Sequence, residues 1–258
     1  MFNFDDYDDI IHRHRFAYWS ASIAAQRGHT GFTVRAGKEM IEAALFGGGA
    51  LFEAGALFET GTTPVGRSNL WNNLWNNLLN VDLPNGLPPE DPLNGDWPED
   101  FQRFMAWHRE KRERMIQAIQ AGGIFAENDT PFVPDPNDED LAHFHGRAAK
   151  LINVYMKAFL FSEINDQARL VVHPPVDFEL LKGLRDAIID RNNNGNPIAY
   201  AQDALAAILR PLHNQPNRVI PWTQLTSAEY EAIIRQFHRL TNGVGLWKIE
   251  KFWTPPIN

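Results

Sequence analysis

The chain has 258 residues, a formal net charge of -8 and no cysteine. Its length suffices for one large domain, and the lack of cysteine excludes disulfides, thiolate-bound zinc, cysteine-ligated iron–sulfur clusters and a cysteine nucleophile. Hydrophobic residues make up 44% of the chain, as in ordinary globular proteins, and no apolar run approaches the roughly 20 residues of a membrane span. The acidic start MFNFDDYDDI lacks the order of a secretory signal, so we expect a cytoplasmic protein without membrane association.

The acidic residues are concentrated in three stretches, residues 5–9, 82–100 and 127–140. These stretches hold 16 of the 32 Asp and Glu residues and contain no Lys or Arg. The rest of the chain therefore has 24 basic residues against 16 acidic ones, a net charge of +8. A basic surface is what a nucleic-acid partner requires, and the overall charge does not exclude one. We expect bases around the cleft that holds Lys150 and acids behind it.

Helical periodicity dominates, and no convincing alternation of apolar and polar residues marks a strand, so we predict an all-α fold. The expected helices cover residues 7–28, 34–46, 68–80, 99–120, 138–162, 175–190, 197–212, 227–241 and 246–252. Clusters of Pro, Gly and Asn separate them without a flexible interdomain tether. We expect one compact unit with two lobes, residues 1–130 and 131–258, that share an active-site cleft.

Two of these helices have patterns with more than one interpretation. Leu and Trp recur at spacings of three and four in residues 68–80, which is typical of a core face but also of the aromatic wall of a ligand cleft. The helix at 99–120 carries five basic residues, which either line a solvated face or face phosphate. These are Arg103, Arg109, Lys111, Arg112 and Arg114.

The most informative stretch begins with a lysine in an apolar helix. Lys150 and Lys157 are seven residues apart, two helical turns, and therefore lie close to one face, with Tyr155 beside them. Burial of an amine disfavours its charged form and makes it available for nucleophilic attack. The alternative is that Lys150 extends along the helix surface to solvent.

The turn HPPVDFELLKGL then places a carboxylate at a helix start. Pro174 and Pro175 restrict the chain before the helix, and we expect Asp177 in its first turn, where free N–H groups and the dipole favour negative charge. Lys150 and Asp177 together would form a nucleophile and an acid–base partner. A purely structural alternative is that Asp177 only caps its helix.

These motifs resemble the helix-hairpin-helix DNA glycosylases, most closely the archaeal 8-oxoguanine type. The likeness rests on GRAAKLINVYMK, with its K-x6-K spacing, on the following loop that ends in PPVD, and on GLWKIEKFW near the end of the chain. It implies Lys150 as the Schiff-base nucleophile, Asp177 as the catalytic carboxylate and Lys157 as a supporting charge. It covers residues 141–184 and the short late helix. The glycine-rich hairpin turn of the wider superfamily is absent here, and only Gly146 remains of it.

A glycosylase must extrude its target base into a pocket, where aromatic rings stack on it. The candidates for stacking are Trp19, Tyr155, Trp247 and Trp253, of which Trp247 matches the family's late helix. The candidates for contact with DNA phosphates are Arg15, His145, Gly146 and Arg147. Lys150 would attack C1′ as the base leaves, and strand cleavage can follow from the imine. If Lys150 stays protonated, Asp177 would instead direct a water molecule.

No metal or cofactor is expected. His12 and His14, like His143 and His145, are two residues apart and point in different helical directions, and no phosphate-binding loop, dinucleotide fingerprint or nucleophile elbow is present.

The leading hypothesis is therefore a monomeric glycosylase that excises a damaged or modified base from duplex DNA. The hypermodified bases of phage DNA are among the candidate substrates, and excision of one of these would make the protein a defence enzyme. The alternatives are a non-enzymatic all-α interaction module and a DNA reader without activity.

Overall fold

The computed structural model describes residues 2–4, 97–120, 124–125, 131–132, 144–160 and 170–253. The regular structure of this part of the chain is helical apart from one antiparallel pair of two-residue strands and two isolated bridges, which confirms the all-α prediction for it. The elements are α5 (Glu99–Gln120), β1 (Ile124–Phe125), β2 (Pro131–Phe132), α6 (His145–Leu160), α8 (Phe178–Asn193), α9 (Ala201–Ile208), η2 (Trp222–Gln224), α10 (Ser227–Thr241) and η3 (Leu246–Phe252), where η denotes a 3-10 helix. The helices expected before residue 97, and most of the predicted N-terminal lobe, lie outside the described residues.

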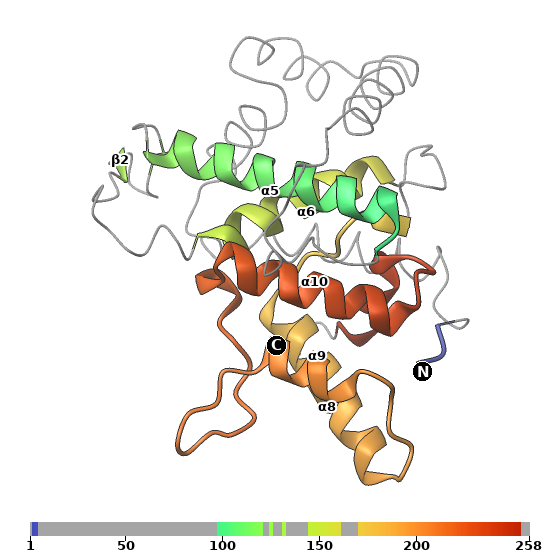
Figure 1. The fold of residues 1–258 in the computed structure, drawn as a ribbon. Helices are drawn as coiled ribbons and strands as arrows, with labels where there is room; N and C mark the ends of the chain where they lie inside the picture. The colour runs from blue at the N-terminus through green and yellow to red at the C-terminus, as the bar shows by residue number, and fades with distance from the viewer. Residues whose placement is uncertain are drawn as a thin grey trace.

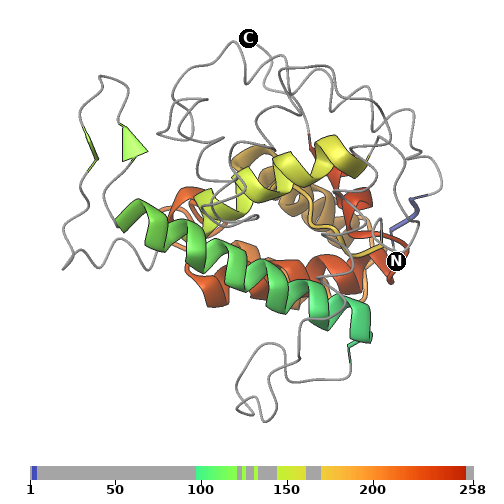
Figure 2. The same ribbon diagram turned by 90° about the horizontal axis from the view of Figure 1, so that it is seen from above.

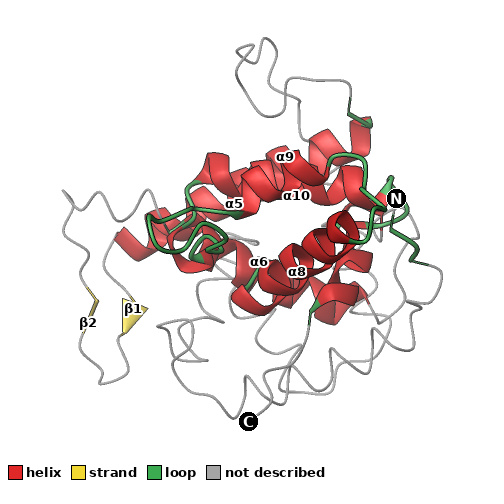
Figure 3. Cartoon of the chain, turned by 90° about the horizontal axis from the view of Figure 1, so that it is seen from below, coloured by secondary structure: helices red, strands yellow, loops and turns green. Residues whose placement is uncertain are grey.

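The long helices α5 and α10 run across the molecule one above the other, and α8 and α9 lie beyond α10 (Figure 1). Helix α5 packs on α6, and α6 packs on α10 and η2. Helices α9 and η3 both contact α10 and α8. Seen from above, α5 and α6 are neighbours over α10 (Figure 2), and from below α6 and α8 lie on the same side of α5 and α10 (Figure 3). The elements that carry Lys150 and Asp177 therefore meet within one helical body. In the described residues, no helix is both long enough and apolar enough to cross a membrane.

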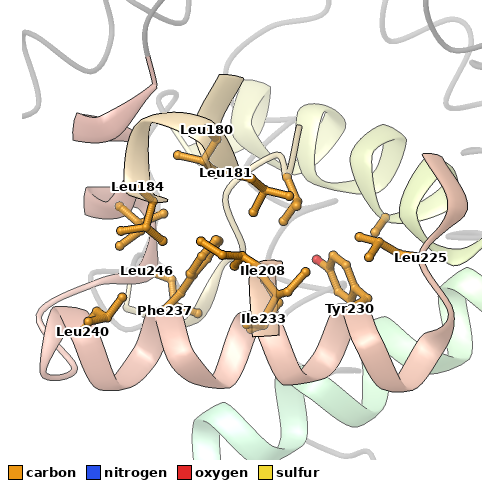
Figure 4. Packing of buried hydrophobic residues seen from close by; sticks show 14 of the residues in the cluster. Leu180, Leu181, Leu184, Ile208, Leu225, Tyr230, Ile233, Phe237, Leu240 and Leu246 are labelled. Atoms are coloured by element: carbon orange, nitrogen blue, oxygen red, sulfur yellow. The ribbon is translucent and has the colours of Figure 1, made fainter. Parts of the chain in front are cut away.

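The core lies between α10, α8 and α9. Buried side chains recur along α10 at helical spacing, from Tyr230 through Ile233 and Phe237 to Leu240, so one stripe of the helix faces inward. Leu180, Leu181, Leu184 and Ile188 form the matching face of α8. Figure 4 shows the two faces meeting, with Tyr230 and Leu240 toward opposite ends of α10.

Helices α5 and α10 begin and end where the sequence predicts. The N-terminus of α10 is defined by a capping box, in which the Glu229 amide donates to Thr226 Oγ1 and the Glu229 carboxylate accepts from the Thr226 amide. Its C-terminus is defined by Asn242 in the left-handed region, at φ 51°. Both signals lie in residues adjacent to the helix ends.

Three other helices have boundaries that differ from the prediction. The expected helix at 138–162 does not include Phe144, and α6 begins at His145. The expected helix at 197–212 is shorter because Tyr200 is left-handed, at φ 64°, and Leu209 is extended and pairs with Val219. The expected helix at 175–190 starts later because Pro174 and Pro175 belong to the preceding loop. Asp177 has extended backbone angles, φ -142° and ψ 176°, and is the N-cap of α8 rather than a member of its first turn.

The first residues of the chain pack on η3. The rings of Phe2 and Phe252 are 4.6 Å apart, and Lys251 Nζ donates to the Asn3 carbonyl at 2.7 Å. On the other side, Gly183 of α8 lies so close to η3 that a Cβ there would be 1.9 Å from the Phe252 carbonyl oxygen. These contacts fix the segment that leads into Trp253.

Candidate active site

Lys150 and Asp177 form a buried ion pair. Lys150 Nζ lies 3.4 Å from Asp177 Oδ2, although the two residues belong to different elements, α6 and the start of α8. The side chains of Lys150 and Asp177 are only 9% and 10% exposed to solvent. The structure thus brings together the two residues that the sequence singled out, and Lys150 does not extend freely into solvent.

The Asp177 carboxylate is held by three donors. Its Oδ1 accepts the Leu180 amide at 2.9 Å, which is the N-cap bond of α8. Its Oδ2 accepts from Lys150 and from the Trp253 indole Nε1, at 3.3 Å. Asp177 therefore both caps its helix and pairs with the lysine. Its role as a helix cap does not exclude a second role beside Lys150. Trp253, expected to stack on a base, lies at the carboxylate.

Trp222 in η2 is a member of this site that the sequence did not reveal. Its ring lies under the lysine, with Lys150 Nζ 4.4 Å from the ring centroid. This arrangement is a cation–π contact, which is stronger at a desolvated site. The ammonium thus has a carboxylate on one side and an aromatic face on another.

Gly146 allows η2 to approach α6. A Cβ at this position would lie 1.8 Å from the Trp222 carbonyl oxygen, and the Gly146 amide donates to the Leu225 carbonyl at 3.3 Å. The amide that the sequence assigned to a DNA phosphate is therefore used inside the fold. The structure gives Gly146 a packing role next to the lysine.

Gly146→Ala is expected to destabilise the protein by about 3 kcal/mol, because the added methyl overlaps a backbone oxygen that can move only with η2. Urea unfolding measures this loss. Gly195→Ala is the matched control, because no atom lies within 4 Å of its new Cβ, and its φ of +71° costs roughly 1–2 kcal/mol. Equal losses in the two variants would contradict the packing role of Gly146.

A polar network lies beneath the ion pair. Asn153 Nδ2 donates to the Pro174 carbonyl at 2.9 Å and to the Tyr230 hydroxyl at 3.0 Å. His108 Nε2 lies 2.8 Å from Asn153 Oδ1, and His173 Nδ1 lies 2.9 Å from the Tyr230 hydroxyl. The amide oxygen of Asn153 can only accept, so His108 Nε2 is the donor to it. The Tyr230 hydroxyl accepts from Asn153, and its O–H is the donor to His173. These bonds join α5, α6, α10 and the loop before Asp177.

Two of the five basic residues of α5, Lys111 and Arg112, are buried, whereas Arg114 is exposed. Arg112 is fully buried and binds Glu231 at 2.5 Å, and Arg109 makes a two-pronged contact with the same carboxylate. Burial would raise the pKa of Glu231, but the hydrogen bonds from Arg109 and the charge of Arg112 outweigh it and hold the pKa below its usual value. Arg112 also lies 4.4 Å over the Tyr230 ring. These two arginines stabilise the fold and do not form a phosphate-binding face.

Three histidines around this network are held neutral. Burial, followed by the charge of Arg112, lowers the pKa of His108 well below its usual value. Burial and then the neighbouring His108 and Arg112 do the same for His173. Burial, with Arg112 nearby, lowers the pKa of His145 to about 4. His145 is thus an uncharged group at neutral pH and offers no positive charge to a phosphate.

Stability is expected to fall as the pH drops below about 6.5, because these imidazoles take up protons in the unfolded chain but not in the folded one. Each contributes up to about 1.4 kcal/mol per pH unit, between the unfolded pKa and its lower folded pKa. Urea unfolding from pH 8 to pH 5 measures the slope. His108→Gln should reduce it, whereas His213→Gln, at an exposed position, should not. A constant free energy of unfolding over this range would contradict the prediction.

The other predicted site residues are placed as follows. Trp247 in η3 is buried, with Lys248 Nζ 5.5 Å from its ring centroid. The Arg147 guanidinium lies 4.9 Å over the Phe144 ring. Trp19 and Arg15, and the side chains of Tyr155 and Lys157, lie outside the described residues.

Within the described ranges, no group of three or more His, Asp or Glu side chains is arranged to hold a metal ion. Comparison with protein families, with curated proteins and with solved structures finds no match to this chain.

Proposed function

We propose that this protein is a DNA glycosylase that extrudes a damaged or modified base from duplex DNA and excises it with Lys150 and Asp177. The observation that carries the proposal is the 3.4 Å approach of Lys150 Nζ to Asp177 Oδ2 at the N-terminus of α8. The same two residues carry the resemblance to helix-hairpin-helix glycosylases, in which they are nucleophile and catalytic carboxylate. The fold we propose is that family's two-lobed arrangement, with the site between the lobes.

The reaction uses the ion pair as a proton relay. Lys150 transfers a proton to Asp177, and the free amine attacks C1′ of the extruded nucleotide. The bond from C1′ to the base breaks, and the base leaves with the proton from Asp177. Opening of the sugar ring then converts the C1′–N adduct into an imine. Water hydrolyses the imine to an abasic sugar and the free lysine, or elimination of the 3′ phosphate cleaves the strand.

The environment of the pair suits this chemistry. Oδ1 of Asp177 is fixed by the Leu180 amide, so Oδ2 faces the lysine in a defined geometry. The Trp222 ring confines Nζ from another side. Because both side chains are nearly enclosed, a base stacked within a duplex cannot reach Nζ, and the proposed reaction requires an extruded nucleotide.

The charge of the helical body supports a DNA partner. The described residues include 17 Lys and Arg against 12 Asp and Glu, a net charge of +5, although the whole chain has -8. Of the 16 acidic residues in the three acidic stretches, only Glu99 and Asp100 are among the described residues. Binding a phosphate backbone requires positive charge at the surface, and the described residues keep an excess of basic groups when Arg109, Arg112 and their partner Glu231 are left out. The binding should weaken steeply with salt.

The experiment is borohydride trapping on a panel of duplexes that carry oxidised, alkylated, deaminated or hypermodified bases. The proposal predicts base release and a covalent adduct with at least one of them. Base release without an adduct would assign the reaction in which Asp177 directs water. Neither base release nor an adduct on any duplex would contradict the proposal.

One observation favours a non-enzymatic alternative. Asp177 makes the N-cap bond of α8, and this bond alone explains an aspartate at that position. A structural cap tolerates asparagine, whereas a proton relay does not. Base release by the wild type would contradict the non-enzymatic alternative, and the variants of Asp177 described in the Discussion separate a cap from a proton relay.

A further inference from the structure

The Asn153 side chain connects the lysine helix to the loop that ends at Asp177. Asn153 lies one helical turn after Lys150 on α6 and is fully buried. Its amide group donates to the Pro174 carbonyl, three residues before Asp177, and to the Tyr230 hydroxyl. Its carbonyl oxygen accepts from His108. Both N–H bonds and the oxygen of this carboxamide are thus used, each toward a different element.

The loop before Asp177 depends on such side-chain bonds. Residues 171–177 are buried, yet Pro174 and Pro175 have no backbone N–H, so the segment cannot be held through donors at these positions. The Pro174 carbonyl is satisfied by Asn153. The neighbouring His173 is held by the Tyr230 hydroxyl, which Asn153 also contacts. The loop is therefore tied to the same helix that carries the lysine.

We propose that Asn153 is a positioning residue for the reaction of Lys150 and Asp177, because its bond to Pro174 sets the distance between the lysine and the carboxylate. This inference rests on the proposed function. The connection from Lys150 to Asp177 through Asn153 is short on both sides. Asn153 is one helical turn from Lys150, and Pro174 is three residues before Asp177. A loop that shifts by 1 Å changes the separation of the pair, and displacements of this size can reduce a rate by about 100-fold.

The test uses the full-length protein and a duplex with one abasic site, whose aldehyde forms an imine with an amine, releasing water. Borohydride reduces the imine to a stable secondary amine, so the rate of trapping reports the lysine directly. In Asn153→Leu, which keeps the branched shape of the side chain but not its hydrogen bonds, we expect trapping at saturating DNA to be at least 10-fold slower. The Kd for the same DNA should stay within about twofold, because the residue is buried.

Leu240→Ala is the matched control. Leu240 is buried on α10, toward the end opposite Tyr230, and its truncation destabilises without touching the loop (Figure 4). Its trapping rate should equal that of the wild type. If Asn153→Leu does not fold, Tyr230→Phe removes the hydroxyl that holds His173 and contacts Asn153, and its trapping should be at least threefold slower. Wild-type trapping rates in the Asn153 or Tyr230 variant would overturn the inference.

A second measurement separates this inference from the proposed function. If the wild type traps no DNA, the proposed function fails, and acylation of Lys150, read by mass spectrometry, tests the connection alone. Lys150 should then react at least fivefold faster in Asn153→Leu than in the wild type, because the ion pair is loosened. Equal labelling would overturn the role of Asn153.

Discussion

Lys150→Ala is expected to abolish base release and borohydride trapping, with a loss of at least about 10³-fold in the single-turnover rate. The variant removes the amine that lies 3.4 Å from Asp177 and 4.4 Å from the centre of the Trp222 ring. No methyl group can replace that nucleophile. Single-turnover assays with a cleavable duplex measure the loss.

Lys182→Ala is the matched control for this variant. Lys182 is an exposed lysine on α8, the helix that Asp177 caps, so its removal changes the net charge by the same amount. Its rate should remain within about twofold of the wild type, apart from a small salt-dependent change in DNA affinity. Retention of activity in Lys150→Ala would remove the lysine from the mechanism and leave the water-directed reaction.

Asp177→Asn and Asp177→Ala are expected to lose activity alike but to differ in stability. Asparagine keeps the oxygen that accepts the Leu180 amide and caps a helix about as well as aspartate. Alanine loses the cap, which costs about 1 kcal/mol more. Neither can accept the lysine proton across the 3.4 Å contact, so both should lower the rate by at least about 100-fold.

The asparagine variant therefore distinguishes a cap from a catalytic group. Urea unfolding and single-turnover rates are measured on the same preparations of both variants. If Asp177 acts only as the cap of α8, Asp177→Asn should keep near wild-type activity while Asp177→Ala loses stability. That result would contradict the proposed proton relay and leave Asp177 with the role of a helix cap alone.

The sequence allowed the helices with local signals to be predicted, and missed boundaries set by tertiary pairing. Helix α10 is bounded by a capping box at its start and by a left-handed Asn242 at its end, and both features depend on residues next to the helix ends. Helix α9 ends at Ile208 because Leu209 pairs with Val219, and no pattern in the neighbouring residues predicts this contact. Periodicity alone therefore extended that helix too far.

The candidate site was predictable only in part. Lys150 and Asp177 were found because a lysine in an apolar helix and an aspartate after two prolines are chemically unusual. Trp222 was missed because it lies in a three-residue 3-10 helix, far along the chain and without periodicity. Asn153 did leave a signal: it is a polar residue one turn from Lys150 on a helix that is otherwise apolar around it.

The basic residues of α5 show why charge counting could not locate a surface. Arg109 and Arg112 read in the sequence as part of a basic helix face, yet both bind the buried Glu231 of α10. Their partner lies more than 100 residues away, so the sequence could not reveal the pairing. The net charge of +5 in the described residues includes these internal groups.

The most direct measurement is the mass-spectrometric location of the lysine that becomes linked to abasic duplex DNA in the wild-type protein under borohydride. The proximity of Nζ to Asp177 predicts that the reduced sugar is attached to Lys150, and that Asp177→Asn greatly slows its formation. An adduct on another lysine, with Lys150 unmodified, or the absence of any adduct, would contradict the assignment of Lys150 as the nucleophile.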